Sequence, residues 1–159
     1  MRQHRPLIYL KHAMLEAERS TCFRGNVGCV IVDRESKAII STGYNGPPSG
    51  EEHCTGHACE GAGSGCRRAV HAEINAMKKS MIWPRPNLDL YVTVSPCGPC
   101  LTEIEVDIRI RRIFYCHEYR DVGHLWACKL EVYKVTPAGY ITRFADNQKR
   151  LVDPESLYD

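Results

Sequence analysis

The sequence predicts an α/β domain with layered architecture, and three features of its 159 residues support this prediction. Segments rich in β-forming residues alternate with segments of helical periodicity, which is the pattern of helices packed on a sheet. A chain of this length fits one domain and can bury a hydrophobic core. The sequence also lacks internal repeats and low-complexity tracts. We therefore expect one domain over residues 1–159, with a core at about 6–145 and a polar C-terminal tail.

The first half of the chain predicts one helix and two strands. Apolar residues recur at helical spacing between residues 6 and 19, which predicts an amphipathic helix. Two short β-rich runs follow at 27–33 and 38–44, and a polar turn joins them. A long loop at 45–67 is rich in Gly, Pro, Cys and His. A loop of this length in a compact domain is usually functional or tied down by something.

The second half continues the alternation of helices and strands, which makes five expected strands in total. Apolar spacing and β-propensity define each of these elements. In chain order we expect a helix at about 70–80, a strand at 88–94, a helix at 99–106, a strand at 111–116, a helix at 122–134 and a last strand at 139–144.

Two short motifs carry metal-binding chemistry. His71 and Glu73 lie at the expected start of one helix, and Cys97 and Cys100 lie at the start of the next. One imidazole and two thiolates suit zinc, and three protein ligands leave the fourth tetrahedral position for water. A carboxylate beside this water can carry protons during hydrolysis. We therefore expect His71, Cys97 and Cys100 to bind a catalytic zinc and Glu73 to be the proton shuttle.

The order of the two motifs makes them specific. A lone Cys-x-x-Cys could be a redox pair or half of a zinc ribbon. Together the motifs form the H-x-E…P-C-x-x-C signature of zinc-dependent deaminases of nucleobases and nucleotides. Residues i and i+2 do not share a face inside a helix, so His71 and Glu73 can converge only if His71 precedes the first helical turn.

Composition excludes several classes of protein. The net charge of +2 does not indicate a strongly basic nucleic-acid surface, and the Arg109-Arg111-Arg112 cluster is too small to make one. No apolar stretch is long enough to span a bilayer, and the N-terminus shows no signal-peptide pattern. We expect a cytoplasmic protein, in the host cytoplasm if it is viral, with no membrane or nucleic-acid partner. In a reducing compartment, its nine cysteines favour metal binding over disulfides.

Several further stretches resemble one family. The chain is similar to the cytidine deaminase-like superfamily and, more closely, to the deoxycytidylate (dCMP) deaminases with their viral and bacterial competence-operon relatives. The Gly-Tyr-Asn-Gly segment at 43–46 distinguishes this branch. The matching stretches are Ser20–Arg24, Val27–Gly28, Thr42–Gly50, His53–Cys54, Val70–Ala76 and Tyr91–Cys100, together with Cys59 and Cys66.

The resemblance implies a three-layer α/β/α fold with a mixed five-stranded sheet. It also implies a hydrolase that converts dCMP to dUMP and ammonia for thymidylate synthesis. Members of this family are commonly homohexamers, with dCTP as activator, dTTP as inhibitor and Mg²⁺ accompanying the triphosphate. Such an allosteric enzyme would bind a deoxycytidine nucleotide as its small-molecule substrate.

The resemblance also assigns substrate contacts. It places Asn45 against the nucleoside, Arg24 against the 5′-phosphate and Tyr119 over the substrate pocket, with Ala72 and Ser95 lining that pocket. Each of the first three has a plain structural alternative. Asn45 is a typical turn residue, Arg24 could be an ordinary surface arginine, and Tyr119 could lie at the edge of the core.

A second, structural zinc is the other implication of the resemblance. Four cysteines fall where many family members carry extra ligands, and His53 or His57 could replace one of them. A closed four-ligand site would tie the junction after the first helix to the long loop. The alternative is a set of free thiols in a loop. The four cysteines are Cys22, Cys54, Cys59 and Cys66.

Two competing functions remain from the sequence. A related enzyme could act on dCTP, on a 5-substituted dCMP or on a free nucleoside, because these substrates differ at pocket walls that the sequence does not locate. A zinc-organised binding module without activity is the non-enzymatic alternative. Glu73 argues against that module, since a closed metal site has no use for an acid that does not ligate.

Overall fold

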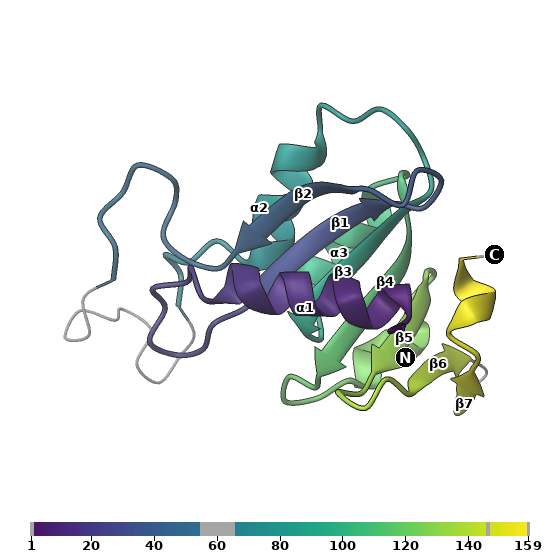
Figure 1. Cartoon of the computed structure of the whole chain (residues 1–159). Coiled ribbons are helices and arrows are strands. Elements are labelled where there is room, and N and C mark those ends of the chain that lie inside the picture. Colours follow the sequence, from purple (N-terminus) through teal and green to yellow (C-terminus); the bar gives the residue numbers. More distant parts are fainter. Residues whose placement is uncertain (1, 55–65, 146, 159) are drawn as a thin grey trace.

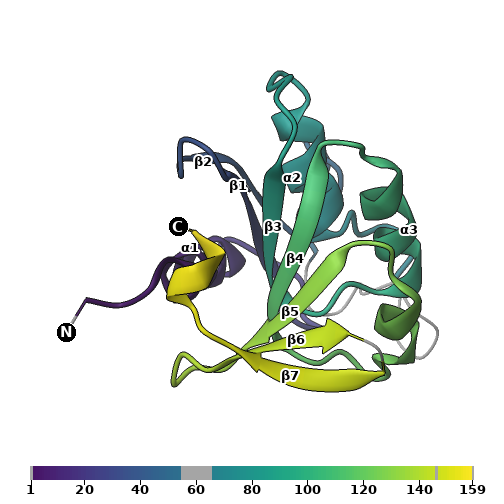
Figure 2. The same ribbon diagram turned by 90° about the vertical axis from the view of Figure 1, so that its right-hand side faces the viewer.

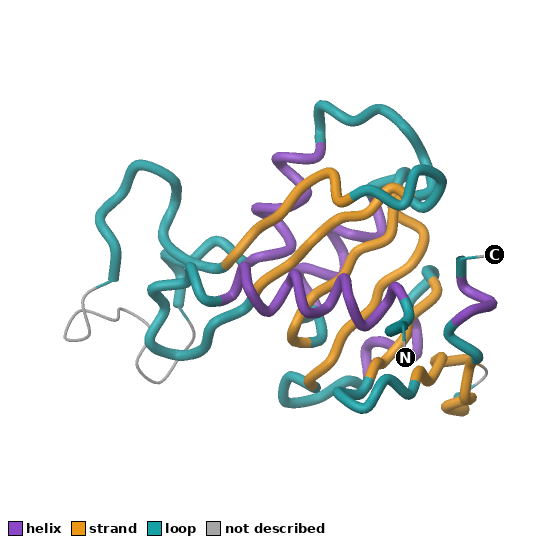
Figure 3. Tube along the Cα trace, in the orientation of Figure 1, coloured by secondary structure: helices purple, strands orange, loops and turns teal. Residues whose placement is uncertain are grey.

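A mixed sheet forms the middle layer of the molecule, and helices cover both of its faces (Figures 1 and 2). The computed structural model describes residues 2–54, 66–145 and 147–158. Within these residues the sheet has seven strands in the order β2-β1-β3-β4-β5-β6-β7. Helix α1 lies on one face, and α2 and α3 lie on the other (Figure 3). This arrangement confirms the expected three-layer α/β/α fold.

The elements follow the expected order through the first two-thirds of the chain. The helices are α1 (Arg5–Ala17), α2 (Ala72–Ser80) and α3 (Gly98–Val106), with 3₁₀ turns η1 (Gly123–Ala127) and η2 (Glu155–Leu157). The strands are β1 (Gly28–Asp33), β2 (Ile39–Tyr44), β3 (Leu88–Val94), β4 (Ile110–His117), β5 (Glu131–Val135), β6 (Ile141–Ala145) and β7 (Gln148–Val152).

The direction of the strands determines where the loops meet. β1 pairs antiparallel with β2 and β3, whereas β3, β4 and β5 run parallel to one another. β6 is antiparallel to β5, and β7 is antiparallel to β6. Because β3 and β4 are parallel, the residues after Val94 and after His117 leave the sheet at the same edge.

The sheet has two strands more than the five expected. The predicted helix at 122–134 is wrong, because this segment forms the short turn η1 followed by strand β5. The strand expected at 139–144 is β6, and it is not the last. The segment expected as a polar tail contains β7 and η2, and its Tyr158 side chain is buried.

Separate apolar clusters fill the two faces of the sheet. On the α1 face, Tyr91, Phe114 and Tyr133 from three adjacent strands stack with ring centroids 4.4 Å and 4.7 Å apart. Aromatic stacking of this kind adds to the stabilisation from area burial. On the opposite face, Ala72 and Ala76 of α2 pack against the sheet together with the apolar residues of α3.

Two further observations concern the surface. The arginine cluster at 109–112 does not form a joint basic surface, because Arg112 is buried in an ion pair with Asp89 and Arg109 is paired with Asp107. Among the described residues, no helix combines the length and the apolar character needed to cross a membrane.

Candidate metal centre

The two motif segments meet because α2 and α3 begin side by side on one face of the sheet. His71 is the N-cap of α2 and Cys97 is the N-cap of α3, and both have extended backbone conformations. His71 therefore precedes the first helical turn, as the spacing to Glu73 requires. Pro99 lies in the first turn of α3, where its missing N–H costs nothing.

The distances among the three expected ligands fit a tetrahedral zinc. His71 Nδ1 lies 3.6 Å from Cys97 Sγ and 3.2 Å from Cys100 Sγ. A nitrogen and a sulfur bound to the same tetrahedral zinc are about 3.6 Å apart, given the usual Zn–N and Zn–S bond lengths. Among the described residues, these three form the one cluster of His, Cys, Asp or Glu side chains with ligand atoms all within 4.8 Å. The site is consistent with a catalytic Zn²⁺.

Glu73 is the buried acid of this centre. Its side chain is 4% exposed, on the second residue of α2. Burial raises the pKa of Glu73 to about 7, because the carboxylate loses hydration, although the nearby His71 opposes the rise. A carboxyl group with this pKa can accept or release a proton near neutrality, which is what general acid–base catalysis needs.

The pKa values of the two cysteine thiols shift in opposite directions. A hydrogen bond from Cys100 lowers the pKa of Cys97 to about 4, and His71 contributes to this effect. The same hydrogen bond, with burial, raises the pKa of Cys100 above its ordinary value. Zinc binds thiolates, so a bound ion would favour the deprotonated form of both cysteines.

The loop before Cys97 is held from the neighbouring strand. The Ser95 N–H donates to the carbonyl oxygen of His117 at 2.8 Å, and the N–H of Tyr119 donates to Ser95 Oγ at 2.8 Å. One residue further, the Pro96 carbonyl oxygen lies 2.7 Å from His124 Nε2. No motif in the sequence indicates this last contact, because the local pattern around His124 predicts a helix.

The five residues that are expected to contact the substrate differ in their burial and in their hydrogen bonds. Ala72 directly follows His71, Ser95 precedes Cys97 by two residues, and both are buried. Tyr119 is joined to Ser95 through its backbone, and its side chain is 43% exposed. Arg24 is exposed. Asn45 follows β2, where its Oδ1 accepts from the Val27 N–H and its Nδ2 donates to the Gly25 carbonyl, each at 2.8 Å.

The expected second zinc site lies partly outside the described residues, which do not include Cys59 or His57. Cys22, Cys54 and Cys66 are half-buried free thiols. Within the described part of the chain, the sulfur atoms of these three cysteines do not all lie within 4.8 Å of one another. The second zinc therefore stays a prediction.

Comparison with known proteins gives one consistent result. The family model for the "Cytidine and deoxycytidylate deaminase zinc-binding region" matches residues 4–117. ComE operon protein 2 of Bacillus subtilis is 34% identical over 114 residues, covering 70% of this chain and 59% of that protein. Deoxycytidylate deaminase of Saccharomyces cerevisiae is 36% identical over 119 residues, covering 70% of this chain. The chain thus spans little more than half of the first relative, and only 37% of the yeast enzyme.

A solved structure extends the similarity to the fold. The dCMP deaminase from the cyanophage S-TIM5, in complex with dCMP and dUMP, superposes with a TM-score of 0.68 at 32% sequence identity. The match covers 80% of this chain and 94% of the phage protein.

Proposed function

The chain belongs to the cytidine and deoxycytidylate deaminase zinc-binding family, and from this premise we propose that it hydrolyses dCMP to dUMP and ammonia. The observation that carries the proposal is the group of His71, Cys97 and Cys100 at the starts of two adjacent helices, with the buried acid Glu73 beside them. Relatives named as deoxycytidylate deaminases and a phage enzyme solved with dCMP and dUMP support this choice of substrate.

The reaction requires water activation and two proton deliveries. Zinc, when bound, supplies a Lewis acid that makes water nucleophilic near neutral pH. His71 would hold the ion through Nδ1, and Cys97 and Cys100 would hold it through sulfur. Glu73 takes a proton from the attacking water and passes it to N3 of the cytosine ring. It then carries a proton to the departing amino group, so that ammonia leaves and the 4-carbonyl of uracil forms.

We assign the remaining contacts by position in the family motif. Ala72 and Ser95 line the base pocket, and Tyr119 covers the base. Asn45 contacts the nucleoside portion, with its amide oriented by the backbone of residues 25 and 27. Arg24 binds the 5′-phosphate, since a guanidinium offers the two parallel N–H donors that a phosphate accepts.

A substrate panel tests the proposal. Purified zinc-loaded protein is incubated with dCMP, dCTP, 5-methyl-dCMP and deoxycytidine, and ammonia release is measured for each. We expect the highest kcat/KM with dCMP. A preference for dCTP or for the 5-substituted nucleotide would replace dCMP by that substrate. Two zinc ions per chain with no turnover on any cytosine compound would favour the binding module instead.

Regulation and assembly complete the proposal. By the family resemblance, we expect a homohexamer that dCTP with Mg²⁺ activates and dTTP inhibits, and a structural zinc held by Cys22, Cys54, Cys59 and Cys66. Adding each triphosphate to the dCMP assay tests the first point, and light scattering gives the assembly. Metal analysis of parent protein and Cys54→Ser tests the structural zinc, which predicts two ions per chain in the parent and one in the variant.

A further inference from the structure

We propose that His124 is a positioning residue of the metal centre, because its imidazole holds the Pro96 carbonyl and thereby fixes Cys97 for zinc. The inference depends on the zinc site of the proposed function, but not on which nucleotide is deaminated. His124 belongs to neither of the two metal-binding motifs, and it reaches the centre from η1.

The contact itself is short and defines the state of the ring. His124 Nε2 lies 2.7 Å from the Pro96 carbonyl oxygen. A carbonyl oxygen only accepts hydrogen bonds, so Nε2 must carry the proton. The half-buried His124 side chain therefore acts as a fixed donor toward the backbone.

The Pro96 carbonyl lies where regular structure cannot satisfy it. β3 ends at Val94 and α3 begins at Gly98, so this carbonyl falls between the sheet and the helix. It is bonded directly to the nitrogen of Cys97, whose own carbonyl accepts the first helical hydrogen bond from Leu101 at 2.9 Å. Rotation of the peptide after Pro96 would therefore displace the Cys97 sulfur, and the donor from His124 restrains this rotation.

The turn that carries His124 is firmly anchored. Leu125, the next residue, is 2% exposed in the core under α2 and α3. The Trp126 ring lies 4.7 Å from the ring of Phe144 on β6. At the start of the turn, Asp121 Oδ1 accepts from the Gly123 N–H at 2.8 Å. The imidazole is thus carried on a rigid element, as a group that orients another residue needs to be.

The expected consequence is a loss of metal affinity. Groups that orient the ligands of a metal are typically worth about 10- to 100-fold in affinity or activity. His124 acts one peptide bond away from the ligand residue, so we expect the lower end of this range. A role confined to folding would instead lower thermal stability and leave the metal site unchanged.

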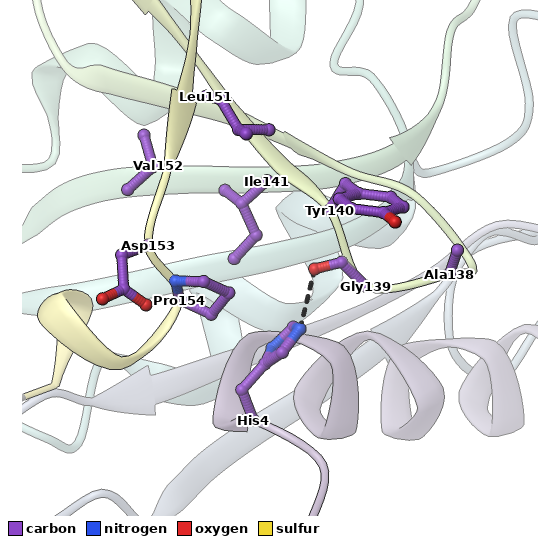
Figure 4. A pocket seen from close by; sticks show the side chains of 9 residues that line it. All are labelled: His4, Ala138, Gly139, Tyr140, Ile141, Leu151, Val152, Asp153 and Pro154. Atoms are coloured by element: carbon purple, nitrogen blue, oxygen red, sulfur yellow. Dashed lines mark hydrogen bonds between the residues drawn. The ribbon is translucent and has the colours of Figure 1, made fainter.

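The experiment compares two replacements at His124 with a matched histidine elsewhere. His124→Leu removes the donor, and His124→Gln keeps an amide N–H at a similar reach. The matched control is His4→Leu, because His4 Nε2 lies 2.8 Å from the Gly139 carbonyl, beside a cavity of about 500 Å³ at the start of α1 (Figure 4). Zinc affinity is measured by competition with a chelating dye, and the Co²⁺-loaded protein is examined by absorption spectroscopy.

We expect His124→Leu to bind zinc about tenfold more weakly and to shift the thiolate-to-cobalt absorption band. His124→Gln should restore both readouts to within about twofold, whereas His4→Leu should lower the melting temperature alone. If His124→Leu does not fold, His124→Asn provides the same comparison, since its shorter amide cannot reach Pro96. Parental zinc affinity and an unchanged cobalt spectrum in the donor-free variant would overturn the proposal, as would failure of the parent to bind zinc.

Discussion

Asp89 and Arg112 form a two-hydrogen-bond ion pair between adjacent strands in the interior of the protein. Arg112 Nε lies 2.8 Å from Asp89 Oδ1, and Nη2 lies 2.6 Å from Oδ2. The Arg112 side chain is 5% exposed and the Asp89 side chain is 0% exposed. The Tyr158 hydroxyl donates to Asp89 Oδ2 at 2.8 Å, and Arg112 Nη1 donates to the Leu157 carbonyl at 2.8 Å. The C-terminal residues are therefore tied to the centre of the sheet.

Replacing Arg112 by methionine should destabilise the fold strongly. Arg112→Met keeps the apolar stem but removes the closer of the two cations that Asp89 contacts, and Arg34 Nη2 remains only at 3.5 Å from Asp89 Oδ1. Breaking one side of a buried pair typically costs about 3–5 kcal/mol. Urea unfolding followed by circular dichroism measures this change. The double variant Asp89→Leu/Arg112→Met should recover most of the loss, and a double variant as unstable as the single one would contradict the role of the charge.

Removal of the Tyr158 hydroxyl should have a smaller effect of the same kind. Tyr158→Phe deletes the donor to Asp89 and the contact between the hydroxyls of Tyr158 and Tyr91. A hydrogen bond to a charged group contributes about 1.5–3 kcal/mol, so we expect a loss of about 2 kcal/mol in the free energy of unfolding. Tyr140→Phe is the control, because Tyr140 is 65% exposed. Equal stabilities of the two variants would argue against the network.

The sequence correctly predicts those helices and strands whose structure is determined by local sequence pattern. Helix α2 and strand β3 have a local pattern, and the ligand positions follow from two short motifs at helix starts. The segment at 122–134 was mispredicted because Val122, Leu125 and Trp126 have the spacing of a helix face. Its second part instead joins the sheet next to β4, where the side chains of Val132 and Val135 are buried. Tertiary pairing of this kind overrides local propensity.

The contact of His124 with Pro96 could not be predicted for a related reason. The two residues are 28 positions apart, and a histidine in an expected helix has no motif of its own. The same is true of the pairing between Asp89 and Arg112, which depends on the register of β3 and β4. Long-range polar contacts depend on the packed fold, whereas each metal-binding motif consists of residues that are close together in the sequence.

Asp107 should give a pH-dependent contribution to stability. Arg109 Nη2 lies 2.6 Å from Asp107 Oδ2, and Arg109 also donates to the carbonyls of Ser80 and Trp83. Burial works to raise the pKa of Asp107, but the hydrogen bonds from Arg109 outweigh it and the pKa falls below its ordinary value. The stabilisation is therefore present above the unfolded pKa and is lost as the pH falls through the lower folded pKa.

Asp107→Asn tests this sign directly. At pH 7 we expect a loss of about 1 kcal/mol, a modest value because the pair lies near the surface. The difference from the parent should shrink as the pH falls below the ordinary aspartate pKa and through the lower pKa of Asp107 in the folded chain. Melting temperatures at pH 3, 5 and 7 measure it. A difference that is independent of pH would show that the charge of Asp107 is not responsible.

Gly43 controls how closely β2 approaches the helix that carries His71 and Glu73. A Cβ atom at Gly43 would lie 2.4 Å from the Ala72 carbonyl oxygen and 2.6 Å from the Ala76 nitrogen. Gly43→Ala must therefore push α2 outward, at a cost of about 1–3 kcal/mol. Zinc affinity should fall together with stability, because the ligand at the start of α2 moves. Gly46→Ala is the control, since a Cβ there meets nothing within 4 Å. Equal zinc affinities in the two variants would contradict this coupling.

The ionised Glu73 side chain should lower the stability of the folded protein, although the same side chain enables catalysis. The variant Glu73→Gln separates these two effects. The pKa of Glu73 in the folded chain, about 7, lies above its ordinary value of 4.5 because burial removes hydration. The contribution of Glu73 to the free energy of unfolding is fully favourable below about pH 4.5. It is lost as the pH rises through about 7, because the carboxylate is hydrated in the unfolded chain and not in the folded one. In chelator-treated protein at pH 8, the glutamine variant should therefore be more stable by about 2–3 kcal/mol.

The same variant should lose turnover by at least about a hundredfold, because an amide cannot carry the proton between water and the base. Zinc content should stay at the parental value, since His71, Cys97 and Cys100 are intact. Denaturant unfolding at pH 5 and pH 8, with dCMP turnover on the zinc-loaded form, provides both readouts. A glutamine variant that turns over substrate like the parent would refute the assignment of the proton shuttle. One that is less stable at pH 8 would instead show that the buried carboxylate contributes hydrogen bonds worth more than its lost hydration.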